Sequence, residues 1–227
     1  MTKLNRLQMA WRAAQDLQEG MVVNLGLGMP VACSDYVPGD REIVFQSENG
    51  VISAGPLAGP NVADPDLVDA GSRQITIAYG GTVIDSTASF AMIRGGHIDV
   101  TLLGAFEVAA NGDLANWDSR IPDKGPLVGG AMDLAATAKA VWVIMEHTTR
   151  KGAPRLLERC SLPLTAPACV KRIYSDLAVI SVTPDGFVVH EIVPDMSQAD
   201  LQAASGAKLI FAPDCGVLRA PDIAEPA

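Results

Sequence analysis

A carboxylate placed directly after a short apolar strand is the first candidate for chemistry in this sequence. The turn Ser47-Glu48-Asn49-Gly50 follows residues 42–46, whose β-branched and aromatic centre predicts a buried strand. Asn and Gly tolerate positive φ, so the Glu is expected at the tip of a tight turn. Open α/β sheets bind ligands outside the carboxyl ends of their strands. Glu48 is therefore predicted to face a ligand site.

Two glycine clusters could line the same site with bare backbone. Gly26 and Gly28 follow the predicted strand at 21–25, and Gly129 and Gly130 precede another apolar segment. Such turns let a ligand approach peptide N–H groups, which stabilise anions and developing oxyanions. A Glu in a turn can equally be a solvated surface residue, and a glycine pair can equally serve close packing. The three turns together predict one site built from several loops.

The size and composition of the chain predict one α/β domain. Of its 227 residues, 48% are hydrophobic and 19% charged, which is enough apolar material for a sizeable core. Only 5% are aromatic, and the small and aliphatic residues that dominate suit helices packed on a parallel sheet. We expect this domain to cover residues 1–219. Residues 220–227 are rich in Pro and acidic side chains and are predicted to form a flexible tail.

Charge and the pattern of cysteine and histidine argue against several classes of partner. The formal net charge is −9 and no basic cluster is longer than two residues, which disfavours nucleic acid and an anionic membrane surface. The four cysteines and three histidines show no zinc-site spacing, so no metal is expected. No signal peptide or membrane-spanning apolar run is recognisable. We therefore expect a soluble cytoplasmic protein.

Hydrophobic periodicity predicts alternating strands and helices. Apolar residues at helical spacing indicate a first helix that Thr2 caps and Gly20 ends, and Ser197 is placed to start a late short helix. Residues 184–186, Pro-Asp-Gly, indicate a hairpin turn. The alternation predicts an open, largely parallel sheet with helices on both faces and a C-terminal β-hairpin. Strands are expected at 21–25, 42–46, 73–78, 98–103, 140–145, 177–182, 187–192 and 208–211.

Two further features leave alternatives open. Residues 53–72 are rich in Pro, Gly and Asp without periodicity, and so long a loop is usually functional, so it is placed to shape a pocket beside Glu48. His97, after two glycines, and Glu146-His147, at the end of an apolar strand, could act as a base or a dyad. Packing or capping roles are the simpler interpretation for these histidines.

A set of motifs in one order along the chain resembles the B subunit of family I CoA-transferases. The resemblance spans roughly residues 5–215 and includes the turn at 47–50. It implies the sheet fold that CoA-transferases share with sugar-phosphate isomerases. The other motifs that carry it are Asn24 to Pro30, Phe90 to Asp99, Leu103 to Phe106, Gly112 to Trp117, Gly129 to Leu134, Met145 to His147, Cys160 to Thr165 and Asp176 to Val179.

The resemblance implies roles for the residues of the three turns. Glu48 would be the nucleophile that carries CoA as a glutamyl thioester, so CoA would be a substrate and covalent intermediate, with no permanently bound cofactor. The backbone amide of Gly130, next to Gly129, would face the thioester oxygen. Ser47 and Asn49 are expected to hold the shape of the turn, because such side chains commonly bond to nearby backbone. The residues implied around substrate and CoA are Gly26, Gly28, Ser47, Asn49 and Gly50.

The resemblance also implies a partner. A chain of this length holds only the B half of the family's site, so we expect an A subunit and an α2β2 complex. This complex would move CoA from an acyl-CoA such as succinyl-CoA to a 3-oxo acid or another carboxylic acid. The acid pair is left open, because Ser72-Arg73 stands where several members have a Lys and a glycine common after the turn is missing. One alternative is a hydrolase or lyase, but such relatives replace the turn's glutamate. Another is a non-catalytic sensor module, which would need phosphate-binding side chains beside Gly26 and Gly28.

Overall fold

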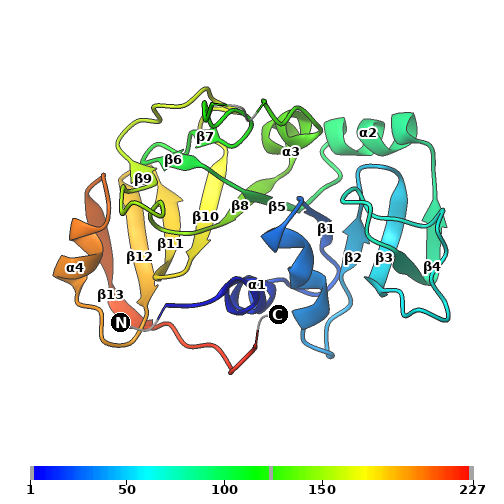
Figure 1. Cartoon of the computed structure of the whole chain (residues 1–227), viewed down its shortest axis with the longest axis horizontal. Helices are drawn as coiled ribbons and strands as arrows, with labels where there is room; N and C mark the ends of the chain where they lie inside the picture. The colour runs from blue at the N-terminus through cyan, green and yellow to red at the C-terminus, as the bar shows by residue number, and fades with distance from the viewer. Residues whose placement is uncertain (1–2, 123–124, 225–227) are drawn as a thin grey trace.

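A ten-stranded sheet crosses the chain in the computed structural model, which describes residues 3–122 and 125–224 (Figure 1). The strands stand in the order β13 (Leu209–Val217), β12 (Gly186–Ile192), β11 (Ala178–Thr183), β10 (Val170–Ser175), β8 (Ala140–Met145), β5 (Val100–Gly104), β1 (Val22–Leu25), β2 (Val44–Gln46), β3 (Val51–Leu57) and β4 (Ile75–Val83).

The centre of this sheet is parallel and its margins are mostly antiparallel. Strands β2, β1, β5, β8 and β10 pair in parallel. Antiparallel pairs flank them, with β3 and β4 beyond β2 and with β11 and β12 beyond β10. Thr183 pairs with Gly186, so a two-residue turn makes the late hairpin, and β13 adds to it in parallel. The prediction of a largely parallel α/β sheet with a C-terminal hairpin is confirmed.

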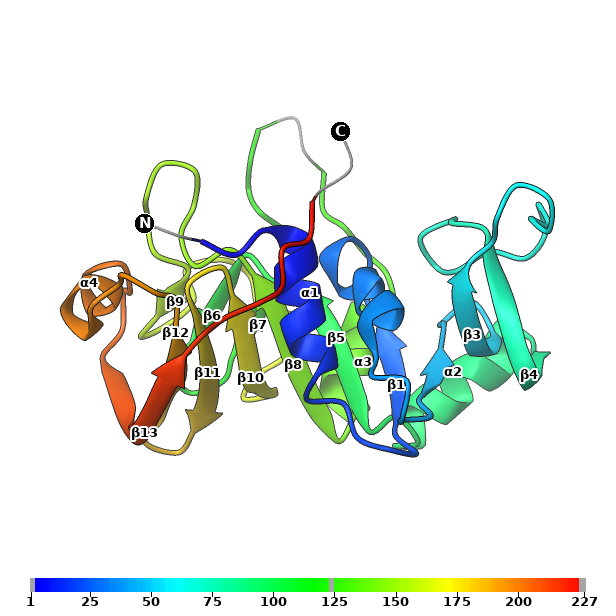
Figure 2. The same ribbon diagram turned by 90° about the horizontal axis from the view of Figure 1, so that it is seen from below.

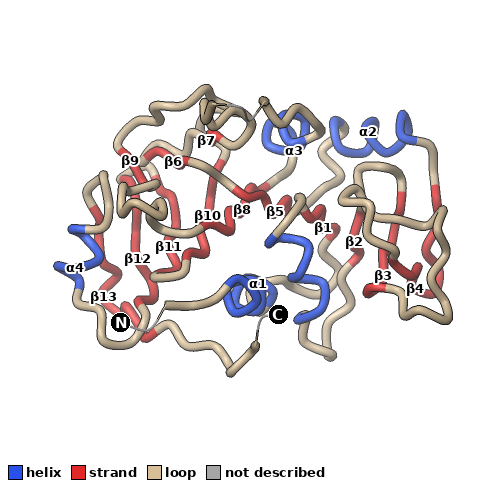
Figure 3. The backbone as a smooth tube through the Cα atoms, in the orientation of Figure 1, coloured by secondary structure: helices blue, strands red, loops and turns tan. Residues whose placement is uncertain are grey.

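Helices cover both faces of the sheet, as expected (Figures 1 and 2). The helix α1 (Arg6–Ala14) and the 3₁₀ helix η1 (Met29–Tyr36) lie on one face, and α2 (Ser86–Arg94) and α3 (Ala131–Thr137) lie on the other. The short helix α4 (Gln198–Ala203) lies at the end of the sheet that carries β13. A second, small sheet has the order β7 (Leu114–Ala115), β6 (Glu107–Ala109) and β9 (Leu156–Leu157) (Figure 3).

The first helix begins and ends inside the range that the sequence predicts. Asn5 caps it through a capping box, in which the Asn5 side chain accepts from the backbone N–H of Gln8 and the Gln8 side chain accepts from that of Asn5. Thr2, the predicted cap, lies outside the described residues. The helix ends at Ala14, and Gly20, with φ of 76°, belongs to the later turn that leads into β1. Its apolar face, which includes Met9 and Ala13, is buried against the sheet.

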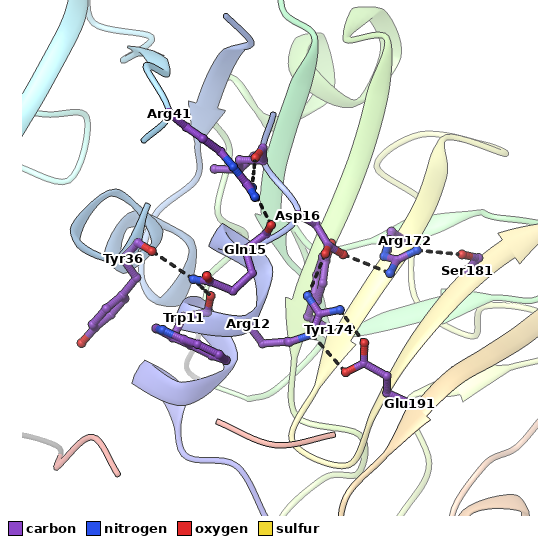
Figure 4. Close-up of polar contacts among 11 residues, drawn as sticks. Trp11, Arg12, Gln15, Asp16, Tyr36, Arg41, Arg172, Tyr174, Ser181 and Glu191 are labelled. Carbon is purple, nitrogen blue, oxygen red and sulfur yellow. Dashed lines mark hydrogen bonds and ion pairs between the residues drawn. The ribbon is translucent and has the colours of Figure 1, made fainter. Parts of the chain in front are cut away.

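A polar network fastens the other side of α1 to β10 and β12 (Figure 4). Arg12 donates to Glu191 at 2.5 and 3.0 Å and to Asp16 at 2.8 Å. Asp16 also accepts from the Tyr174 hydroxyl at 2.8 Å and pairs with Arg172 at 3.0 Å. The charged partners offset the cost of burying Arg12 and Asp16. Their hydrogen bonds fix the orientation of the helix on the sheet.

The last described residues return to α1 after β13 (Figure 2). The side chain of Asn5 donates to the carbonyl of Ile223 at 2.6 Å, and that of Gln8 donates to the carbonyl of Pro221 at 2.9 Å. A single domain over 1–219 and a flexible tail over 220–227 stay predictions, and residues 225–227 lie outside the described part.

Two segments of the sheet differ from the sequence expectation. Residues 53–57, predicted as part of a long loop, belong to β3, and Pro and Gly there sit in a strand whose pairing with β4 is irregular. The strand β10 was not predicted, because Lys171 and Arg172 interrupt its apolar pattern. Arg172 instead joins the α1 network, while Ile173 and Tyr174 are buried. In both segments the sequence pattern is overridden by contacts with residues far away in the chain.

Candidate active site

A cavity of about 420 Å³ lies where β1, β2 and β5 end, so it occupies the carboxyl edge of the parallel strands. The chain crosses here from the β1–β2 side of the sheet to β5 on the other side of β1, which is the position where open α/β sheets form crevices. Its walls are mainly apolar. Among the described residues, Glu48 and Arg155 are the charged side chains that line it.

Glu48 is half-buried in this cavity and lies against Gly130. Burial raises the pKa of the Glu48 carboxyl, the backbone N–H of Gly130 donates to it and opposes that rise, and the charge of Asp133 adds to the rise. A carboxylate with a raised pKa is a weakly solvated one, which favours its use as a nucleophile. The charge of Asp133 is itself paired, because Arg94 donates to it at 2.8 Å.

Position 130 requires a glycine because of the space around its Cα rather than because of its backbone angles. Its φ is −69° and its ψ is −5°, which any residue adopts. A Cβ atom built there would lie 2.2 Å from Oε2 of Glu48 and 3.1 Å from Cζ of Phe90. The missing side chain therefore provides the room that the Glu48 carboxylate occupies, and it leaves the Gly130 N–H accessible to that carboxylate. Gly129 also lines the cavity.

The rest of the turn supports Glu48 from outside the cavity. The N–H of Gly50 donates to the carbonyl of Ser47 at 2.9 Å, and Gly50 has φ of +118° with no room for a Cβ. The hydroxyl of Ser47 accepts from the N–H of Ala70 at 2.9 Å, and the amide of Asn49 donates to the carbonyl of Val68 at 2.8 Å. Ser47 and Asn49 thus join the turn to the segment that follows β3, and none of the three turn residues lines the cavity.

The two glycines after β1 have different surroundings. Gly26 lines the cavity, but its N–H donates to the carbonyl of Leu102 at 2.8 Å and so is already used within the sheet. A Cβ at Gly26 would lie 2.9 Å from that same oxygen. Gly28, with φ of 83°, precedes η1 and lies beyond the lining residues. The structure thus brings Gly26, Glu48 and the pair at 129–130 to one cavity.

Two polar residues of the cavity were not singled out from the sequence. Asn116 lines it. Its side-chain amide N–H donates to the carbonyl of Gly104 at 3.0 Å, and its side-chain oxygen accepts from the hydroxyl of Thr165 at 2.6 Å. Arg155, from the segment before β9, lines it and lies 3.9 Å from Glu146. Asn116 stood in a recognised motif, but no local pattern around Arg155 indicates a site, because only the fold brings it there.

The two candidate histidines, His97 and His147, do not line the cavity. His97 is exposed after α2. His147 is fully buried between the hydroxyls of Ser175 and Ser205, at 3.1 and 2.8 Å from its two ring nitrogens. Burial lowers the pKa of His147 to about 4, so its ring is neutral at neutral pH.

The structure also bears on metals, disulfides and membranes. Within residues 3–122 and 125–224, His, Cys, Asp and Glu side chains form no group of three that could hold a metal ion. The four cysteines, which all lie in that part, are free. No helix in the described ranges is long and apolar enough to cross a bilayer.

Comparisons with known proteins show which family this chain belongs to. Residues 6–204 match the family described as coenzyme A transferase. The chain is 48% identical over 210 residues to the B subunit of the 3-oxoadipate CoA-transferase of Acinetobacter baylyi, covering 92% of this chain and 97% of that protein. It is 40% identical over 212 residues to the mitochondrial succinyl-CoA:3-ketoacid coenzyme A transferase 2A of Rattus norvegicus, covering 92% of this chain and 40% of that protein.

Solved structures agree on the fold. The acyl-CoA transferase YdiF of Escherichia coli O157:H7, as apoenzyme, superimposes with a TM-score of 0.71 at 20% identity, covering 94% of this chain and 43% of that chain. The glutaconate coenzyme A-transferase of Acidaminococcus fermentans gives a TM-score of 0.68 at 17% identity, covering 97% and 91%. The chain therefore belongs to the coenzyme A transferase family, among that family's B subunits.

Proposed function

We propose that this chain is the B subunit of an enzyme that moves CoA between two carboxylic acids through a thioester on Glu48. The observation that carries the proposal is the half-buried carboxylate of Glu48, which lies in an apolar cavity under the backbone N–H of Gly130. The names of the relatives support succinyl-CoA as donor and a 3-oxo acid as acceptor. CoA is then a substrate and covalent intermediate rather than a resident cofactor.

The first half of the reaction loads the enzyme. The Glu48 carboxylate attacks the carbonyl of the acyl-CoA, and the C–S bond breaks to leave an acyl-glutamyl anhydride and CoA thiolate. The thiolate then attacks the Glu48 carbonyl of the anhydride, so that a glutamyl-CoA thioester forms and the donor acid leaves as its carboxylate. The thioester energy is conserved in this exchange, and covalent catalysis of this kind follows ping-pong kinetics.

The second half reverses these steps with another acid. The acceptor carboxylate attacks the glutamyl thioester and displaces CoA thiolate, and the thiolate attacks the acceptor's carbonyl in the new anhydride. The product acyl-CoA leaves and the Glu48 carboxylate is regenerated. At each attack on the Glu48 carbonyl, its oxygen becomes negative beside the Gly130 N–H. A donor in that position contributes about 2.7–4 kcal/mol to the transition state.

The acid is expected to lie along the apolar wall with its reacting carboxylate at Glu48. Arg155 adds positive charge to the same cavity, which suits an acid with a second carboxylate, such as 3-oxoadipate or succinate. Arg73 does not line this cavity, because its guanidinium is paired with the carboxylate of Asp69 at 2.8 Å. We further propose an A chain as partner, in an α2β2 complex, because the relatives that span a similar length are named as B subunits.

The test is covalent loading of the co-expressed A and B chains. Incubation with succinyl-CoA in the absence of an acceptor acid should add the mass of CoA to the peptide that contains Glu48. Borohydride, which reduces such thioesters, should inactivate the loaded complex and leave the unloaded complex active. Glu48→Gln should give neither adduct nor exchange.

Three outcomes would contradict the proposal. The adduct could map to another residue, or Glu48→Gln could keep full exchange. Steady release of free CoA to water, with no transfer to any acid of a panel, would favour a hydrolase on the same scaffold.

A further inference from the structure

A buried polar cluster lies beneath the turn that carries Glu48 and has no role in the exchange chemistry. It consists of Asn24 in β1, Gln46 in β2 and Ser89 in α2, each at most 2% exposed. We propose that Gln46 is a positioning residue, whose side-chain amide sets the peptide that carries the Glu48 nucleophile. The inference rests on the proposed function of Glu48.

The side chain of Gln46 connects three elements of the fold. Its Oε1 accepts from the amide of Asn24 at 2.6 Å, and its Nε2 donates to the hydroxyl of Ser89 at 2.7 Å and to the carbonyl of Ser47 at 3.1 Å. Asn24 also donates to the backbone carbonyl of Gln46 at 3.1 Å. The amide is thus held from β1 and α2 before it reaches the turn.

The carbonyl of Ser47 is the acceptor that matters for position. It belongs to the peptide bond that joins Ser47 to Glu48, so its direction sets the orientation of the Glu48 backbone N–H and Cα. Three donors converge on it, namely the N–H of Gly50 at 2.9 Å, Nε2 of Gln46 at 3.1 Å and the hydroxyl of Ser89 at 3.5 Å. A carbonyl with this many donors has little freedom to rotate.

Close packing alone does not explain why polar side chains occupy these buried positions. Thr101, opposite Asn24 in the parallel β1–β5 pair, is fully buried, and its hydroxyl has no hydrogen-bond partner within residues 3–122 and 125–224. Apolar side chains of similar volume in place of Asn24, Gln46 and Ser89 would serve stability about as well, since replacing both partners of a buried hydrogen bond by apolar groups can be nearly neutral. Gln46 does not line the cavity of Glu48, so any effect on the chemistry acts through the turn.

The test compares buried side chains that differ in their contact with the turn. Gln46→Met keeps length and removes the donor to Ser47, and Ser89→Ala removes the acceptor that orients Gln46. Ser175→Ala is the matched control, because Ser175 is also a buried serine, bonded to His147 and to the backbone of Ala178, away from the cavity. The readouts are kcat, KM, the single-turnover rate of CoA loading and the melting temperature of the A–B complex.

We expect Gln46→Met to lower kcat and the loading rate by about 10- to 100-fold with KM nearly unchanged, because small misplacement of a reacting group costs about that much. Ser89→Ala should lower kcat several-fold. Ser175→Ala should lower the melting temperature while kcat stays at the wild-type value.

The inference is overturned if Gln46→Met and Ser89→Ala keep wild-type kcat while Glu48→Gln is inactive, and the proposed function then stands. It is also overturned if kcat in all three variants falls only in step with the melting temperature. If Gln46→Met does not fold, Ser89→Ala against Ser175→Ala decides the question. A wild-type complex that neither loads nor exchanges CoA refutes the proposed function itself.

Discussion

At Gly130, one added methyl group would meet the proposed nucleophile. Gly130→Ala fits the backbone, since φ is −69°, but its Cβ would lie 2.2 Å from Oε2 of Glu48. The flexible end of the Glu48 side chain can move away, so the fold should survive while the carboxylate leaves its place under the Gly130 N–H. We expect kcat to fall by about 10²-fold or more, with a nearly unchanged melting temperature.

The control for this variant is Gly39→Ala. Gly39 also lacks a positive φ, and in the described part of the chain no atom lies within 4 Å of a Cβ built there; it does not line the cavity. It should leave both kcat and stability unchanged. If Gly130→Ala loses melting temperature and keeps kcat, the glycine serves packing alone.

Asp133 offers a test of how charge tunes Glu48. Burial and the charge of Asp133 raise the pKa of Glu48, and only the ionised carboxylate attacks, so activity should fall as the pH drops through that raised pKa. Asp133→Asn removes a negative charge and leaves Arg94 positive, which lowers the pKa of Glu48. The acid limb of the loading rate should therefore move to lower pH. Asp185→Asn, in the distant β11–β12 turn, makes the same change of net charge and should leave the limb in place.

Of the residues predicted for the site, Gly26, Glu48, Gly129 and Gly130 line the cavity, but the sequence did not show why each is needed there. Glu48 and Gly130 were candidates because of strand-end position and glycine content, and the structure places them in contact. The reason for Gly130, which is clearance for a side chain 82 positions earlier (130 − 48), depends on the fold. The hydrogen bond from the Gly26 N–H to the carbonyl of Leu102 and the position of Arg155 in the cavity likewise depend on residues far apart in the sequence. None of these leaves a local pattern.

Between elements, His147 links the end of β8 to the end of β10 and to the residues after α4. Its ring nitrogens contact Ser175 and Ser205, and its pKa falls from 6.5 to about 4 because it is buried. The unfolded chain therefore binds one more proton than the native state between these values. The stabilisation is complete above about pH 6.5, declines as the pH falls towards 4, and is absent below it. The total is about 3 kcal/mol.

Urea unfolding between pH 4 and pH 7 measures this effect. His147→Gln should lower stability at pH 7 and flatten the pH dependence, because the titrating group is gone. Ile180→Val removes a buried methylene from β11 and changes no ionisable group, so it should keep the wild-type slope. An unchanged slope in His147→Gln would show that other groups carry the acid sensitivity.

Elements with a clear apolar period were predictable, and those built on tertiary partners were not. The strand β8 has the predicted bounds, 140–145, and β1 differs by one residue, because both are largely apolar runs at the centre of the sheet. The strand β10 contains two basic residues, of which Arg172 finds Asp16 just after α1. The sheet of β6, β7 and β9 has strands of two or three residues, too short for any period to register.

At the scale of the whole molecule, the cavity has an apolar rim that faces outward. Leu27 and Val128 line it and are 63% and 75% exposed. Exposed apolar side chains grouped around a site often mark a surface that another chain covers. The single-chain rat relative is more than twice as long as the matched region, whereas the relatives named as B subunits match almost end to end.

We therefore expect the purified chain alone to catalyse no CoA exchange, and an added A chain to restore turnover. The physical reason is that the exposed rim of the isolated chain leaves acyl-CoA without the contacts that would hold it in place against Glu48. Light scattering should show a larger complex when activity appears, and Val128→Glu should weaken complex formation while the B chain still folds. Ile210→Glu, on the distant β13 and 37% exposed, is the matched control and should assemble normally. Full transferase activity from the isolated B chain, or equal assembly of both variants, would contradict this expectation.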